Sequence, residues 1–237
     1  FVATAILALG AAAIYALAYP GAMEFDSYVQ LLEARTDSYA FWHPPVMSWL
    51  LGNFDLLPGT VSAWFTAMDM LMAFGALAIL LSLPRRVSWA GVVALAAFLA
   101  LPQLALLQAA VWKDALFADA TVLGAVLLAF AVGRWKDRRR RFAALAAATI
   151  LFALAILTRQ NGIVILPFLA AGLAWAVRRV SGSWRQGAAY GAAMAAAALA
   201  IVVAATAALL LRWDGTPSTQ EQLNVLKLYD ITGMVKS

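Results

Sequence analysis

Long apolar segments alternate with short polar ones along this chain. A helix that crosses a membrane needs about 20 consecutive, mostly apolar residues. We predict seven such helices, at residues 1–19, 61–83, 89–107, 115–133, 142–157, 163–177 and 187–211. The fifth and sixth are short and are separated only by T-R-Q-N-G, and the seventh is dominated by alanine. The pattern therefore predicts an all-α, polytopic integral membrane protein.

The overall composition supports a membrane protein. Hydrophobic residues make up 65% of the chain and charged residues only 12%, whereas soluble domains carry roughly 25% charged residues. Because there is no cysteine, disulfides and thiolate sites are excluded. The single histidine, His43, excludes a metal site made of several histidines.

The basic residues gather on one predicted side of the membrane. Eleven of the 17 Lys and Arg lie in the short loops at 84–88, 134–141 and 178–186, whereas only one of the 12 acids, Asp137, lies among them. By the positive-inside rule these loops face the cytoplasm. The basic residues behind the net charge of +5 are thereby explained as determinants of membrane topology, and we expect no nucleic-acid partner.

Four polar segments are then predicted to meet on the extracytoplasmic side. They are residues 20–58, the V-W-K-D segment, T-R-Q-N-G and residues 212–237. We treat residues 1–211 as one transmembrane module whose first outer loop covers residues 20–60. Residues 212–237 are expected to begin an extracytoplasmic loop or a further region, and we expect the chain to be incomplete.

The first outer loop predicts two short surface helices. Ser27–Gln30 matches the S-x-x-Q capping box, and the apolar residues around it recur at helical spacing, which predicts an amphipathic helix. Asp26 would lie just before that helix and would help to cap it, or would act chemically. The Pro44-Pro45 pair favours an extended backbone at His43 and a second helix over residues 45–54.

The same loop resembles a known class of enzymes. Phe25-Asp26-Ser27, followed by Phe41-Trp42-His43-Pro44-Pro45-Val46, is similar to the F-D-E and aromatic-x-H-P-P motifs of protein O-mannosyltransferases, which are GT-C class membrane glycosyltransferases. The aminoarabinose transferases have a related pattern. The resemblance covers the first loop, loosely the layout of the helices, and not residues 212–237. Ser27 replaces the second acid and Glu24 precedes the motif, so a two-acid role does not carry over.

This resemblance implies an inverting glycosyltransferase. It would move a sugar from a polyprenyl-phosphate donor lipid to a hydroxyl of a glycan, lipid or protein at the extracytoplasmic face of the bacterial inner (cytoplasmic) membrane. Asp26 is expected to be the catalytic base. Lys113 and Arg159 are expected to bind the donor phosphate. The alternative for Lys113 is an ion pair with Asp114, or a position at the membrane interface.

Further residues are assigned to the predicted site. Expected substrate-binding residues are His43, Gln160, Asn161 and Tyr28, although His43 also fits a structural role, and Gln160 and Asn161 also fit caps of a broken helix. Carboxylates suit Mg²⁺, Mn²⁺ or Ca²⁺. A divalent cation is therefore a further expectation, with Asp26, Glu24 and Asp114 as its ligands.

Two acids lie inside predicted membrane helices. Asp69 and Asp119 would face a polar cavity, pair with a base such as Lys113, or contact the substrate. Such acids, together with a broken helix, also fit a membrane transporter or flippase for a lipid-linked or small polar substrate, which is the alternative function. An accessory membrane subunit is a further alternative. Transport predicts movement without covalent change, whereas glycosyl transfer predicts a new glycosidic bond.

Overall fold

The computed structural model describes residues 1–37, 44–84 and 87–211, and within them the protein is almost entirely helical. The elements in chain order are α1 (Val2–Ala18), β1 (Ala22–Met23), α2 (Phe25–Thr36), α3 (Pro45–Asp55), α4 (Val61–Ser82), α5 (Trp89–Leu99), α6 (Pro102–Ala109), β2 (Ala110–Val111), α7 (Lys113–Gly133), α8 (Arg138–Thr158), η1 (Gln160–Val164), α9 (Ile165–Ser181) and α10 (Trp184–Leu210). The predicted all-α class is confirmed, apart from the two short strands, which pair in parallel.

Five helical segments are long and apolar enough to cross a membrane. They are α4, α7, α8, the η1–α9 segment from Asn161 to Ser181, and α10. Within the described residues, α5 and α6, which are bent by 56° relative to each other, make a sixth only if the two together form one span. Pro102 explains the bend, because proline cannot continue a helix through its own position but fits the first turn of the next one. Helix α1 is apolar but has only 17 residues, so a seventh span stays a prediction.

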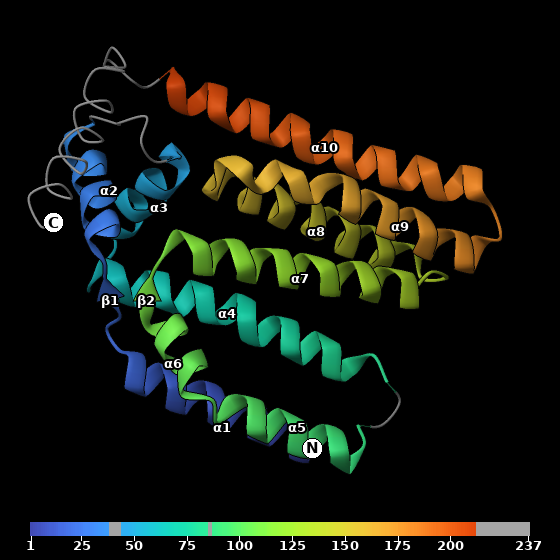
Figure 1. Cartoon of the computed structure of the whole chain (residues 1–237), viewed down its shortest axis with the longest axis horizontal. Coiled ribbons are helices and arrows are strands. Elements are labelled where there is room, and N and C mark those ends of the chain that lie inside the picture. Colours follow the sequence, from blue (N-terminus) through green and yellow to red (C-terminus); the bar gives the residue numbers. More distant parts are fainter. Residues whose placement is uncertain (38–43, 85–86, 212–237) are drawn as a thin grey trace, which may run out of the picture.

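The long helices run alongside one another, with the short elements at one end (Figure 1). Helix α7 packs against α4 and α8, and α9 packs against α10. Helices α2 and α3 and the two strands lie at the left end in Figure 1, and the α7–α8 and α9–α10 loops lie at the right end. The described basic loops and the first loop therefore lie at opposite ends of the bundle, which agrees with the predicted separation.

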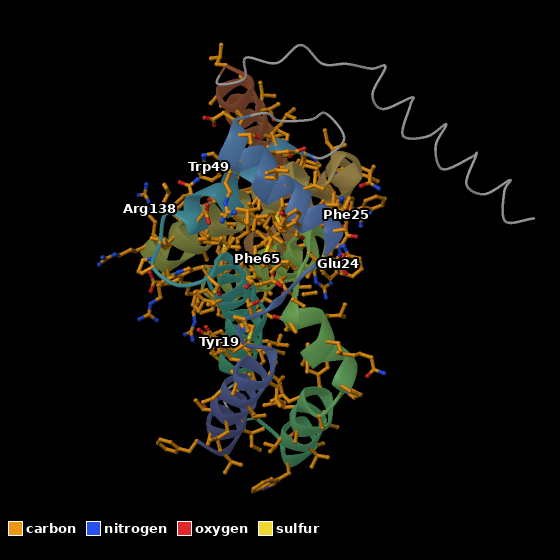
Figure 2. The ribbon with its side chains drawn as sticks, turned by 90° about the vertical axis from the view of Figure 1, so that its left-hand side faces the viewer. Tyr19, Glu24, Phe25, Trp49, Phe65 and Arg138 are labelled. Atoms are coloured by element: carbon orange, nitrogen blue, oxygen red, sulfur yellow. The ribbon has the colours of Figure 1, made fainter. Side chains whose placement is uncertain are left out.

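A buried apolar core fixes the α2–α3 pair to the bundle. Met47 and Leu51 of α3 pack with Phe65 of α4 and Leu116 of α7, and all four are fully buried. In Figure 2, Phe65 lies among the side chains in the middle of the molecule, while Glu24 and Phe25 lie at its edge. Because the same core includes Leu31 of α2 and joins α2, α3, α4, α7 and α8, α2 has a defined position relative to α7.

Glycines allow the closest approach between α9 and α10. A Cβ atom added to Gly191 would lie 2.5 Å from the carbonyl oxygen of Ala170, and one added to Gly187 would also collide with a carbonyl oxygen, that of Ala174. Gly187 and Gly191 are four residues apart and share one face of α10. This spacing is typical of helix pairs that pack closely in membranes.

Several local predictions differ from the observed elements. Helix α2 begins at Phe25 with Glu24 at its N-cap, so the predicted capping box at Ser27–Gln30 is wrong. Asp26 consequently lies in the first turn instead of before the helix, where the helix dipole still favours a carboxylate. The second loop helix, α3, begins at Pro45 as expected. That α2 and α3 lie on a membrane surface stays a prediction.

Candidate functional site

The parallel strand pair brings two distant segments together. Ala22 pairs with Ala110 and Met23 with Val111, and the hydroxyl of Ser27 donates a hydrogen bond to the carbonyl oxygen of Val111. Strand β1 leads directly into α2, and β2 leads directly into α7. The first turns of α2 and α7 are therefore held next to each other.

An ion pair joins these two first turns. Lys113 Nζ lies 3.1 Å from Asp26 Oδ2 and donates a hydrogen bond to it. The lysine side chain is 21% exposed and the aspartate side chain 45% exposed. Both groups are thus held by the fold and remain reachable from outside. Two residues that the sequence assigned to one reaction, as base and as phosphate ligand, are direct neighbours.

A second ion pair lies beside the first. Arg159 Nη1 lies 3.1 Å from Asp114 Oδ1, without the alignment of a hydrogen bond, and the guanidinium carbon of Arg159 is 5.8 Å from the ring centroid of Phe117. Arg159 has an extended backbone between α8 and η1, so the predicted helix break at T-R-Q-N-G is confirmed. Both side chains are partly exposed.

The four charged groups form an alternating set. Lys113 and Asp114 are consecutive, so the chain of charges runs from Asp26 through Lys113 and Asp114 to Arg159. The net charge of this set is zero. An incoming phosphate would find two cations, each already facing a carboxylate. Binding would therefore require the phosphate to compete with Asp26 and Asp114 for these cations.

The other predicted site residues are less closely grouped. Tyr28 is 59% exposed and lies two residues after Asp26 on α2, which places it on a different side of that helix. Asn161 and Glu24 are exposed. His43 and the side chain of Gln160 lie outside the described residues. The substrate-binding roles of these residues stay predictions.

The predicted metal ligands do not form a cluster. Across residues 1–37, 44–84 and 87–211, no three His, Cys, Asp or Glu side chains gather closely enough to hold an ion. Asp26 and Asp114 each face a basic side chain instead. A divalent cation at these residues stays a prediction.

A network that the sequence did not indicate braces α2 against α3. Arg35 donates from Nε and Nη2 to the two carboxylate oxygens of Asp55, with both distances 2.7 Å. The hydrogen bond from Arg35 lowers the pKa of Asp55 below its usual value. Buried Glu33 accepts a hydrogen bond of 2.6 Å from Ser48 Oγ. These partners are 15 and 20 residues apart, so helical periodicity could not reveal them.

The two membrane acids lie next to each other, away from these ion pairs. Asp119 Oδ2 accepts a hydrogen bond of 2.7 Å from Nε2 of Gln108. Asp69 is fully buried, and its carboxyl group faces that of Asp119. Asp119 therefore does not pair with Lys113, which was one of the alternatives that the sequence left open.

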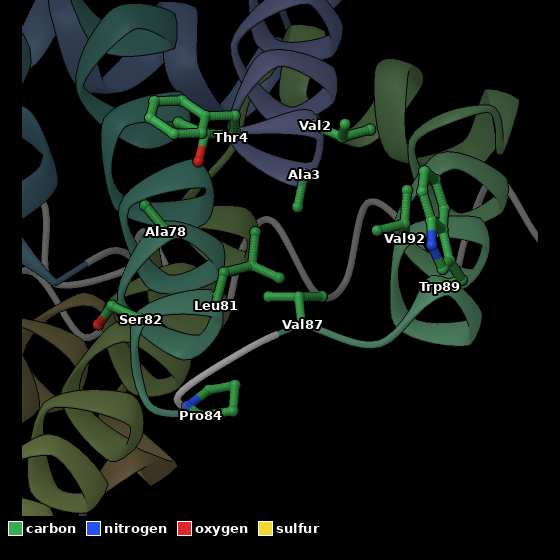
Figure 3. A pocket seen from close by; sticks show the side chains of 11 residues that line it. Val2, Ala3, Thr4, Ala78, Leu81, Ser82, Pro84, Val87, Trp89 and Val92 are labelled. Atoms are coloured by element: carbon green, nitrogen blue, oxygen red, sulfur yellow. The ribbon is translucent and has the colours of Figure 1, made fainter.

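A large hollow lies away from the charged set. A groove of about 710 Å³ lies between α1, the end of α4 and the start of α5, at the opposite end of the bundle (Figure 3). Its described lining is mostly apolar, with the hydroxyls of Thr4 and Ser82 as polar groups. None of the predicted site residues lines it.

The chain was also compared with known proteins. No family model, curated protein or solved structure matches it. The resemblance to GT-C glycosyltransferases accordingly rests on the motifs of the first loop, and any function has to be argued from the site itself.

Proposed function

We propose that the protein is a membrane glycosyltransferase that moves a sugar from a polyprenyl-phosphate donor to an acceptor hydroxyl. One observation carries the proposal. Asp26 and Lys113, separated by 87 positions in the sequence, lie 3.1 Å apart on the first turns of two helices. A second cation, Arg159, is bound to the neighbouring Asp114. A carboxylate next to one cation, with a second cation paired to the neighbouring carboxylate, supplies the base and the positive charge that transfer from a phosphate ester requires.

The reaction would be a single displacement. The acceptor oxygen attacks the anomeric carbon, and its proton passes to the carboxylate of Asp26. The new glycosidic C–O bond forms as the bond between the anomeric carbon and the phosphate oxygen breaks. The electron pair of that bond leaves with the polyprenyl phosphate, whose negative charge Lys113 and Arg159 stabilise. Attack from the side opposite the phosphate inverts the configuration.

Donor binding would rearrange the charged set. Arginine offers phosphate a planar fork of N–H donors, and lysine offers a compact point charge. Exposed ion pairs contribute only about 0–1 kcal/mol, so exchanging a carboxylate partner for phosphate costs little. As Lys113 turns to the phosphate, Asp26 Oδ2 loses its donor and becomes free to accept the hydroxyl of the acceptor. The site would thus acquire its base only when the donor is present.

Transfer of labelled sugar from polyprenyl-phosphate donors in membranes tests the proposal. We expect Asp26→Asn to reduce transfer by about 10²–10⁴-fold, the usual contribution of a general base, with donor binding retained. Asparagine keeps the size of the side chain and can accept a hydrogen bond, but it cannot take the proton. Asp55→Asn, which also removes a paired carboxylate from the same loop, is the matched control. Equal transfer by wild type and folded Asp26→Asn would refute the role of Asp26.

A transporter or flippase is the second candidate function. The buried pair of Asp69 and Asp119 favours it, because acids inside membrane helices commonly lie on substrate or ion pathways. The helix break before η1 is a further feature of transporters. Reconstituted vesicles separate the two functions. Movement of a lipid-linked sugar between leaflets without a new glycosidic bond would support transport and refute transfer.

A further inference from the structure

Two carboxyl groups meet inside the membrane-spanning part of the protein. Asp69 comes from α4 and Asp119 from α7, and Gln108 comes from α6. Asp69 is 0% exposed, and neither of its carboxyl oxygens has a hydrogen-bond partner among the described residues. The structure therefore shows a buried acid that still needs a hydrogen-bonding partner.

No described cation faces this pair. Within residues 1–37, 44–84 and 87–211, the titratable group that faces Asp69 is Asp119, and Asp119 faces Asp69 and the neutral amide of Gln108. The other described titratable groups on α7 and on the helices packed against α4 and α7 do not face the pair. They are Tyr15 and Tyr19 near the end of α1, Asp55 on α3, Lys113 and Asp114 at the start of α7, Arg138 to Arg141 and Arg159 on or after α8, and Arg178 and Arg179 on α9.

A second observation comes from Gln108. Its side chain is 3% exposed, its Nε2 donates to Asp119, and its Oε1 has no described partner. The cluster thus has several oxygens that can accept a hydrogen bond and lacks a donor for them. A proton on one carboxyl group would provide that donor.

Two adjacent carboxylates cannot both remain charged in such surroundings. Each would lose its hydration, and the two negative charges would repel each other. Binding one proton removes one charge, ends the repulsion and creates an O–H donor. We propose that Asp69 and Asp119, with Gln108, form a proton-binding site in which at least one carboxyl group is protonated at neutral pH.

The surroundings favour a proton over a metal cation. Asp119 lines a cavity of about 170 Å³ between α4, α5, α6 and α7, and the other lining residues are all apolar. A sodium or calcium ion needs several oxygen ligands, and Ca²⁺ takes six to eight. The described residues supply only two carboxyl groups and one amide oxygen here. This inference does not depend on glycosyl transfer.

Infrared spectroscopy of the purified full chain in lipid nanodiscs tests the proposal. The carbonyl stretch of a protonated carboxylic acid is separate from the bands of carboxylates. We expect wild type to show this band at pH 7 and the Asp69→Asn/Asp119→Asn double variant to lose the equivalent of one acid group. Asp55→Asn, which removes a carboxylate that faces water, should keep it. Buried Glu33 is present in all three proteins and cancels in the difference spectra.

Two results with wild type and the double variant would overturn the proposal. One is identical acid bands in wild type and the double variant. The other is a wild-type band that is absent in sodium chloride and present in choline chloride, which would make the cluster a metal-cation site. If the double variant does not fold, Asp119→Asn replaces it, since asparagine can still accept from Gln108. The band of the remaining acid should then shift in frequency because its partner has changed, and an unshifted band would also overturn the proposal.

Discussion

The close contact between α9 and α10 allows a quantitative prediction for Gly191→Ala. The added Cβ would lie 2.5 Å from the carbonyl oxygen of Ala170, whereas ordinary contacts begin at 3.4 Å. Helix α10 must therefore retreat by about 0.9 Å from α9 to accept one methyl group. Gly172 is the matched control, because it lies on α9 and a Cβ there would meet nothing within 4 Å.

The expected cost follows from two opposing terms. Overpacking typically costs about 1–3 kcal/mol, and replacing glycine by alanine inside a helix recovers about 0.8–1.0 kcal/mol. Gly191→Ala should therefore lower the free energy of unfolding by about 1 kcal/mol, and Gly172→Ala should raise it by about 1 kcal/mol. The two variants should thus differ by about 2 kcal/mol.

The difference can be measured by unfolding both variants in detergent micelles with increasing SDS, followed by far-UV circular dichroism. Wild type and both variants are compared at the same protein concentration and at the same concentration of the micelle-forming detergent, and only the amount of SDS is varied. If Gly191→Ala is as stable as Gly172→Ala, α10 does not pack against the carbonyl groups of α9 in the way described, and the reasoning fails.

Three further predictions concern the end of the bundle that carries α2, α3 and the two strands. Lys113→Met should weaken donor binding by about 10–100-fold, because a hydrogen bond to a charged group contributes about 1.5–3 kcal/mol. Lys136→Met in the α7–α8 loop is the control. Equal donor affinities of Lys113→Met and wild type would argue against a role of Lys113 in binding phosphate. The Arg35–Asp55 pair should stabilise the fold at neutral pH and lose this effect as the pH falls below about 4, because the folded pKa of Asp55 is lowered relative to the unfolded chain. Unfolding temperatures of wild type and Asp55→Asn should therefore differ at pH 7, and the difference should shrink as the pH falls through the lowered pKa of Asp55, so a constant difference would contradict this. Ser27→Ala should destabilise the protein by about 1 kcal/mol, since it removes the buried hydrogen bond to Val111, and unchanged unfolding would show that this bond contributes nothing.

Helix positions could be predicted from hydropathy, and their ends only in part. The apolar run that begins at Val61 became α4, which starts at the same residue. The run predicted from residue 142 became α8, which starts earlier, at Arg138. The hydropathy pattern left the four arginines at 138–141 outside the predicted helix. In the structure they form its first turn, because Asp137 accepts a hydrogen bond from the backbone N–H of Arg140 and caps the helix. Capping therefore overrode hydropathy at this end.

The site was predictable as a location and not as a set of contacts. Topology placed Asp26, Lys113 and Arg159 on one side of the membrane, and the structure places all three at one end of the bundle. Their pairing depends on two strands of two residues each, which leave no periodic signal in the sequence. The capping-box pattern at Ser27 was misleading for the same reason, because its hydroxyl bonds to Val111, 84 positions away, instead of to its own helix.

The bend between α5 and α6 has a mechanical consequence for the charged set. Helix α6 runs directly into β2, and only Trp112, the N-cap of α7, separates β2 from Lys113, so there is little chain between them that could absorb a displacement. A change in the 56° angle would therefore move Val111 and, with it, the lysine that faces Asp26. A force that opens or closes the bend between α5 and α6 would thus change the spacing of Asp26 and Lys113, which couples the geometry of this ion pair to the lateral pressure on the two helices.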